Sequence, residues 1–158
     1  WMKLDSLESV LQKQNLLKDQ LRGPGMKMTW SNPRETILEA VLARGDRRLS
    51  TAIEDAWKRG AKFDAWMDQF NFNVWMDAFD AAHLPPDFYT SRDRSLDEIL
   101  PWDHINTGVS RKYLEREYQN AIDGKTTGDC REGCLACGIV PALSAQRKGA
   151  DWYCPEVE

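Results

Sequence analysis

Three cysteines near the C-terminal end of the sequence have the type and spacing to bind a metal. They are Cys130, Cys134 and Cys137, in the stretch TTGDCREGCLACGIV, and their spacing is C-x3-C-x2-C. Thiolate sulfur is a ligand of zinc and of iron-sulfur clusters. In a reducing compartment, cysteines crowded in this way favour a metal over disulfides. We therefore interpret these residues as metal ligands.

Cys154 supplies a fourth thiolate and extends the pattern to C-x3-C-x2-C-x16-C. Four thiolates close a tetrahedral site, and a closed site is structural and not catalytic. Within the pattern, CLACG, from Cys134 to Gly138, is typical of a zinc knuckle, in which the glycine lets backbone amides turn toward the sulfurs. Four thiolates suit an auxiliary 4Fe-4S cluster equally well. Zinc is our first expectation, and the cluster and metal-free thiols stay open as alternatives.

The sequence disfavours a catalytic cluster, in which three thiolates would leave one iron open for S-adenosylmethionine. In the radical S-adenosylmethionine (radical SAM) enzymes that use this spacing, a barrel follows the motif, and even a partial barrel needs on the order of 200 residues. Far fewer residues follow Cys137 here. Ala136 also stands before the third cysteine, where those enzymes usually have an aromatic residue. We therefore predict no catalytic residue in this motif.

A second cluster, in the stretch ARGDRRLS, gathers charged side chains around one glycine. Arg44, Arg47 and Arg48 supply three guanidinium groups, which bind phosphate or carboxylate through paired hydrogen bonds. We predict that this arginine corner binds an anion or a partner. The simpler interpretation is a helix corner in which Asp46 caps the next helix and the arginines stay solvated.

The stretch PWDHINTGVS places Asp103 next to His104. An aspartate-histidine pair can transfer protons, which makes these two residues a candidate polar site. The simpler interpretation is a loop histidine bonded to the backbone. His83, the other histidine, precedes the sequence LPP, and we expect it to cap the end of a helix.

The composition limits both function and location. With 158 residues, the chain has the size of one domain and can bury a core without crosslinks. Its net charge of -4 removes the broad attraction that non-specific nucleic-acid binders use, so any RNA contact must be local.

No apolar run approaches the ~20 residues of a membrane span and no secretory signal is recognisable, so we expect a cytoplasmic protein. Because the chain opens on Trp1 and not on methionine, we expect further sequence upstream.

Apolar spacing and capping residues predict several helices. The first covers residues 3–22, and the second has Asn32 as N-cap, Pro33 at its first position and Gly45 at its end. Further helices are expected from Asp46 to Gly60, over 63–70, over 74–83, and from Ser110 to Gly124. Residues 26–30, MKMTW, predict a short strand, and residues 87–94 a polar connection.

These elements predict a mainly α protein, a small helical bundle with a C-terminal cysteine-rich metal-binding tail. The expected parts are an N-terminal amphipathic helix in 1–25, the helical bundle in 26–124 and the four-cysteine tail in 125–158. The helices between Asn32 and Phe79 should form the core. The large side chains expected to be buried there are Leu38, Leu42, Ile53, Trp57, Trp66 and Trp75.

Three long segments resemble one known family. They are LEAVLARGDRRLSTAIEDAWKRGAKFDAWMDQFNFNVWMDAF, LPWDHINTGVSRKYLEREYQNAI and TTGDCREGCLACGI. Together they resemble the C-terminal region of the cobalamin (B12)-binding radical SAM proteins, and more closely the subfamily found beside or fused to a small radical-SAM-linked partner protein. Members of that family often have a further cysteine soon after the CxxCG element, where this chain reads Val140-Pro141. The resemblance therefore leaves Cys154 as the candidate for the fourth ligand.

The resemblance implies an accessory domain of an enzyme. In that family a cobalamin-binding domain and the radical SAM barrel lie upstream, and the family's catalytic cluster motif has no counterpart here. S-adenosylmethionine and cobalamin would thus belong to the parent protein, while this segment caps the barrel and carries a structural metal. The alternative function is a stand-alone zinc-stabilised helical adaptor that binds RNA or protein through the arginine corner.

Overall fold

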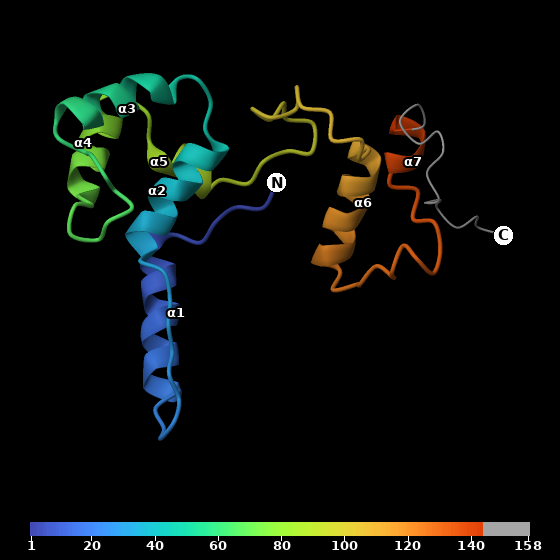
Figure 1. The fold of residues 1–158 in the computed structure, drawn as a ribbon, viewed down its shortest axis with the longest axis horizontal. Coiled ribbons are helices and arrows are strands. Elements are labelled where there is room, and N and C mark those ends of the chain that lie inside the picture. Colours follow the sequence, from blue (N-terminus) through green and yellow to red (C-terminus); the bar gives the residue numbers. More distant parts are fainter. Residues whose placement is uncertain (144–158) are drawn as a thin grey trace. The chain divides into compact units, whose positions relative to one another are not determined.

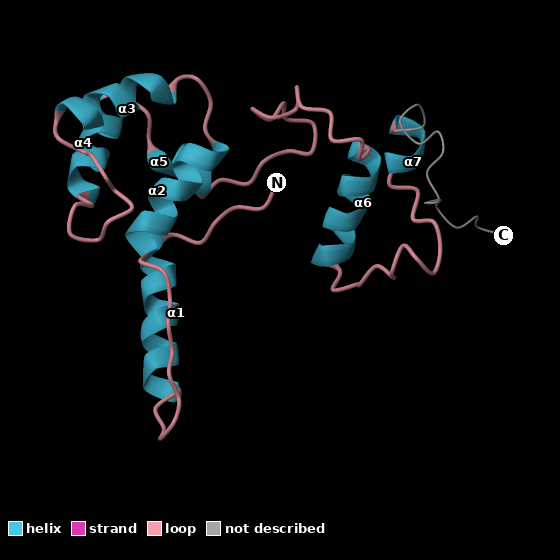
Figure 2. Cartoon of the chain, in the orientation of Figure 1, coloured by secondary structure: helices cyan, strands magenta, loops and turns pink. Residues whose placement is uncertain are grey.

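The protein is all-helical in the part of the chain that the computed structural model describes, residues 1–143. Within these residues it forms seven helices and no strand (Figures 1 and 2). They are α1 (Leu7–Gln20), α2 (Pro33–Arg44), α3 (Leu49–Lys58), α4 (Phe72–Ala81), α5 (Pro86–Thr90), α6 (Arg111–Ile122) and α7 (Ile139–Ala142). The predicted all-α class is confirmed. The short strand predicted for residues 26–30 is wrong, because that segment is an extended loop without a strand partner in the described chain.

The chain divides into two compact units. The first runs from Trp1 to Pro101 and contains α1 to α5, and the second begins at Trp102 and contains α6 and α7. The boundary falls inside the segment 26–124 that the sequence predicts as one bundle. No helix within residues 1–143 has the length and apolar character needed to cross a membrane.

Local capping sets the start of α1 and α2; the Asn32 cap is as predicted, whereas α1 begins at Leu7, after the predicted start at residue 3. The Ser6 hydroxyl accepts a hydrogen bond from the Ser9 amide at 3.2 Å, and the Asn32 side chain accepts one from the Arg34 amide at 3.0 Å. Pro33 is the first residue of α2, where its missing N–H would have had no helical partner. α1 has no buried residue, whereas α2 buries Ile37, Leu38 and Val41. The N-terminal helix therefore packs less tightly than α2 to α5, but not less tightly than α6 and α7, which also bury no residue.

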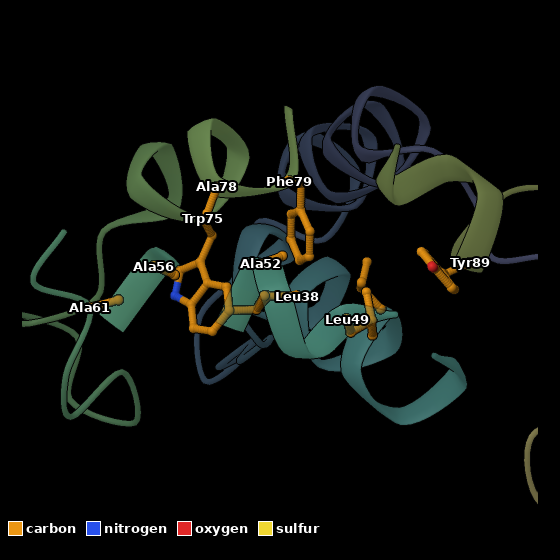
Figure 3. Close-up of a cluster of buried hydrophobic side chains, with 10 residues drawn as sticks. Leu38, Leu49, Ala52, Ala56, Ala61, Trp75, Ala78, Phe79 and Tyr89 are labelled. Atoms are coloured by element: carbon orange, nitrogen blue, oxygen red, sulfur yellow. The ribbon is translucent and has the colours of Figure 1, made fainter. Parts of the chain in front are cut away.

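The core of the first unit lies where α4 packs on α3 and α2. Trp75 and Phe79 point from α4 into this core (Figure 3), with ring centroids 6.0 Å apart. They meet small residues, since Ala52 and Ala56 of α3 and Ala78 of α4 are fully buried. Leu38 of α2 and Leu49 of α3 join the same cluster. The alanines let the helices approach closely while the two aromatic rings fill the remaining volume.

Two of the six side chains predicted to be buried are in this core, namely Leu38 and Trp75, which is 7% exposed. The prediction is wrong for the other four, which are all exposed: Leu42, Ile53, Trp57 and Trp66. On α3 the reason is rotational. Each residue turns about 100° around the helix axis, so the face that buries Ala52 and Ala56 directs Ile53 and Trp57 toward solvent.

The helix predicted over residues 63–70 is also wrong. Residues 64–69 form a series of turns, and Phe63 has a positive φ of 59° that no α-helix contains. Phe63 stacks on Trp66 with ring centroids 5.0 Å apart, and both rings are exposed. The i, i+3, i+4 spacing of the aromatic residues thus reflects an exposed turn cluster and not a buried helix face.

The polar connection predicted for residues 87–94 contains instead the short helix α5, which Pro86 begins. Tyr89 and Thr90 are buried, and the guanidinium of Arg94 is buried with them and donates to the Tyr89 carbonyl. Burial lowers the pKa of Arg94 and raises the pKa of Tyr89. The first residues of the chain are tied to this segment, because the Leu4 amide donates to the Thr90 carbonyl at 2.8 Å.

The helices α3, α4 and α6 end in the same hydrogen-bonded turn, the Schellman motif. In α4 the His83 amide donates to the Asp80 carbonyl and the Leu84 amide to the Phe79 carbonyl, each at 2.9 Å. The residue after the C-cap must be left-handed, and it is Gly60 after α3 and Gly124 after α6, but His83 after α4, with φ 55°. His83 therefore does end a helix as expected, but through its backbone.

We predict that two tryptophan variants will separate the core from the exposed loop. Trp75→Ala should lower the free energy of unfolding by about 3 to 5 kcal/mol, because it empties the α3–α4 contact. Trp66→Ala should cost about 1 kcal/mol or less, since Trp66 is 60% exposed and loses mainly its stacking on Phe63. Urea unfolding measures both values. Equal costs would contradict this assignment of the core.

His83→Gly should stabilise the first unit by about 1 kcal/mol, because glycine adopts the left-handed conformation without the strain that a Cβ adds. Gly60→Ala is the matched control at the equivalent position of α3, where φ is 103°. It should destabilise the unit by a similar amount, although its Cβ would meet no atom within 4 Å. If both substitutions shift unfolding in the same direction, left-handed strain does not govern these helix ends.

Candidate metal centre

The start of α6 holds the cysteine segment in place. The Ser110 hydroxyl caps α6 by accepting a hydrogen bond from the Tyr113 amide at 3.3 Å, as the sequence predicts. The amide of the same serine donates to the Cys137 carbonyl at 2.7 Å. One residue therefore joins the helix to the C-x2-C turn.

The C-x2-C turn, residues 134–138, has the backbone geometry of a zinc knuckle. The Ala136 amide donates to the Cys134 sulfur at 3.5 Å, and Ala136 has a positive φ of 52°. Gly138 follows with φ 100°, and a Cβ there would lie 3.1 Å from the Gly108 carbonyl oxygen and from Ser110. Glycine is thus needed at 138 both for its conformation and for the close approach of the 108–110 loop.

Two side chains of α6 complete the surroundings of the turn, and the sequence analysis missed both. Arg116 donates to the Leu135 carbonyl at 2.6 Å, and its guanidinium carbon lies 4.9 Å from the centre of the Tyr113 ring. Desolvation raises the pKa of Tyr113, and Glu117 and the thiols of Cys137 and Cys130 raise it further. The Tyr113 hydroxyl is therefore within electrostatic reach of two of the predicted ligands. The i, i+3 spacing of Tyr113 and Arg116, which places them on one face of α6, was the sequence signal that could have identified them.

The described residues contain three of the four predicted ligands. Cys134 and Cys137 are half-buried in the turn, and Cys130 is exposed at its entry. Within residues 1–143 no three histidine, cysteine or carboxylate side chains converge to hold a metal ion. Cys154 lies outside the described residues. The knuckle geometry fits a thiolate-bound metal, because the N–H···S bond and the left-handed glycine direct backbone donors toward sulfur.

The arginine corner is less open to a ligand than the sequence predicts. Arg44 donates to the Met2 carbonyl at 2.9 Å, and Arg48 pairs with both carboxylate oxygens of Asp46. The hydrogen bond from Arg48 lowers the pKa of Asp46. Asp46 also accepts the Arg48 amide at 2.9 Å, so it caps the turn that leads into α3. Arg47 is exposed, and its guanidinium forms no hydrogen bond or ion pair within residues 1–143. Anion binding at the corner stays a prediction that now depends on Arg47.

The structure separates the two members of the candidate polar site. Asp103 pairs with Arg111 at 3.2 Å, at the start of α6. The neighbouring His104 is exposed, and its imidazole makes no hydrogen bond within residues 1–143. The observed partner of Asp103 supports a role in anchoring the loop to α6. Proton transfer by this pair stays untested.

Comparison with known proteins identifies no relative. No family model matches the chain, and neither a curated protein nor a solved structure matches it. The resemblance drawn from the sequence segments therefore remains a hypothesis.

Gly138→Ala should weaken zinc binding about tenfold or more, because the substitution strains the knuckle and presses on the 108–110 loop. Gly133→Ala is the matched control in the same segment. A Cβ at 133 meets no atom within 4 Å, so zinc affinity should stay the same. Competition titration with a chromophoric chelator measures both affinities. Equal affinities for the two variants would contradict the knuckle assignment.

Proposed function

We propose that this chain is a non-catalytic accessory domain whose second unit binds one metal ion or cluster through Cys130, Cys134, Cys137 and Cys154. The observation that carries the proposal is that the described part of this unit, residues 102–143, has no core. Between residues 102 and 143 no side chain is buried, whereas the first unit buries ten apolar residues in one cluster. Ordering a residue costs about 1 to 2 kcal/mol of backbone entropy, which burial does not offset in this segment. A metal bound to thiolates would do so, because its binding free energy becomes local folding energy.

The chain's own residues prepare this binding. Ser110 and Arg116 hold the carbonyls of Cys137 and Leu135, and the Ala136 amide is oriented toward the Cys134 sulfur. A preformed turn of this kind lowers the entropy lost on binding. A four-thiolate metal would supply structural stability and no open coordination position. Zinc is the first candidate and an auxiliary 4Fe-4S cluster the second.

The accessory role is supported by the resemblance to the C-terminal region of the cobalamin-binding radical SAM proteins. In that role the domain would cap the upstream barrel, with the cobalamin-binding domain and a small radical-SAM-linked protein as its other partners. The alternative of an RNA-binding or protein-binding adaptor at the arginine corner has less support, because Arg44 and Arg48 already have internal partners. The upstream genomic sequence tests the accessory role. The upstream sequence should encode a C-x3-C-x2-C motif with an aromatic residue, followed by a barrel. If this motif and the barrel are absent, the adaptor function is favoured.

Metal analysis of anaerobically purified protein should find one zinc per chain, or iron with a broad absorption band near ~400 nm. Cys134→Ser should reduce the metal content and release the segment after α6, as measured by hydrogen exchange. The urea unfolding of the Trp75 core should not change, since that core belongs to the first unit. Stoichiometric absence of both metals, with four thiols that titrate freely in the native protein, would refute the metal proposal.

A further inference from the structure

A groove in the first unit combines an apolar floor with an acidic rim. It lies between α2 and the α3–α4 connection and has a volume of about 510 Å³. Its lining contains two sets of residues: the apolar set, which we call the floor, is Leu38, Leu42, Ala43, Ala65 and Phe70, and the acidic set, which we call the rim, is Glu35, Glu39 and Asp64. We call it the acid-rimmed groove. It lies wholly within the first unit, so it is independent of the metal site.

The three rim carboxylates lack internal cations. None of them forms an ion pair within residues 1–143, and Glu35 accepts only the Asn32 amide, at 3.3 Å. Glu39 is exposed. Asp64 differs from the two glutamates, because its Oδ1 atom is buried without any hydrogen-bond partner in the structure. A buried acceptor without a donor is costly, and a carboxylate oxygen more so than a neutral one. The carboxylates that line the groove therefore have no cation partner within residues 1–143.

The segment beside the groove exposes large apolar side chains. Phe63, Trp66 and Met67 flank Asp64 and Ala65, and Met67 is 82% exposed. Phe63 also holds a left-handed backbone conformation, which strains a residue of its size. Backbone strain and neighbouring exposed apolar side chains both occur at binding surfaces.

We propose that the acid-rimmed groove binds an amphipathic helix of another polypeptide, with apolar side chains on the floor and an arginine or lysine on Asp64. Charge complementarity identifies this occupant. Three unpaired carboxylates repel phosphate groups, which disfavours RNA and nucleotides at this surface. An amphipathic helix lays its apolar face into a groove of this kind and carries its cations along the edges of that face. An arginine at the edge of that face would pair with the carboxylates that line the groove, which form no ion pair within residues 1–143.

The test uses synthetic peptides and the full chain. The first peptide is an amphipathic helix with leucine on one face and arginine on the flanking positions, the second has glutamate for arginine, and the third is a scrambled version of the first. Fluorescence anisotropy of the labelled peptides measures binding. The arginine peptide should bind, more weakly as salt increases, and the other two should not. Absence of binding by the arginine peptide, or equal binding of the glutamate peptide, would overturn the proposal.

Variants of the rim carboxylates test whether the arginine peptide binds at the acid-rimmed groove. Asp64→Asn should weaken binding of the arginine peptide about tenfold or more, and Glu39→Gln by a few-fold. Glu8→Gln on α1 removes the same charge away from the groove and should leave affinity unchanged. Glu39→Gln neutralises an exposed side chain without changing its size, so it keeps the test valid if Asp64→Asn proves unfolded by circular dichroism. Equal affinity in Glu8→Gln and Glu39→Gln, or competition by a single-stranded RNA oligonucleotide, would count against this occupant.

Discussion

The first unit depends on the close contact of α3 with α4. Ala52 and Ala56 on α3 and Ala78 on α4 are fully buried, and small side chains at these positions let the two helices approach. Trp75 and Phe79 then reach the residues of α2 and fill the space between three helices (Figure 3). A larger side chain at any of these alanines would separate the helices and open the core.

The same contact determines the outer surface of the unit. Once Ala52 and Ala56 face α4, Ile53 and Trp57 must face solvent, and the connection to α4 must run past the edge of α2. That connection carries Asp64 and Ala65 to the groove beside Leu42. The exposed apolar residues and the acidic rim thus both depend on which face of α3 packs against α4. We infer that a partner helix binds the surface that this orientation leaves exposed.

The second unit follows a different principle. Its described residues have no buried side chain, and its order depends on specific polar contacts, such as Ser110 with Cys137 and Arg116 with Leu135. Such contacts contribute only about 1 kcal/mol each in water. Ala136, beside the thiols, has a left-handed backbone conformation, and the metal that we propose would add stability at this point.

The sequence by itself determined the features that depend on near neighbours. Asn32 and Ser110 begin their helices and Gly124 ends one, because each cap is a hydrogen bond or a backbone conformation within a few residues. The knuckle around Gly138 belongs to the same class. The turn itself closes within five residues, through the hydrogen bond from the Ala136 amide to the Cys134 sulfur.

Only the tertiary structure decided which apolar residues became core. On α3, a stripe of Leu49, Ala52 and Ala56 competes with a neighbouring stripe of Ile53 and Trp57, and the larger residues made the second stripe an equal candidate from sequence. The helix periodicity of Phe63 and Trp66 was equally ambiguous. The choice depends on the shape of α4, which lies far along the chain, because alanine allows a close helix contact that tryptophan prevents.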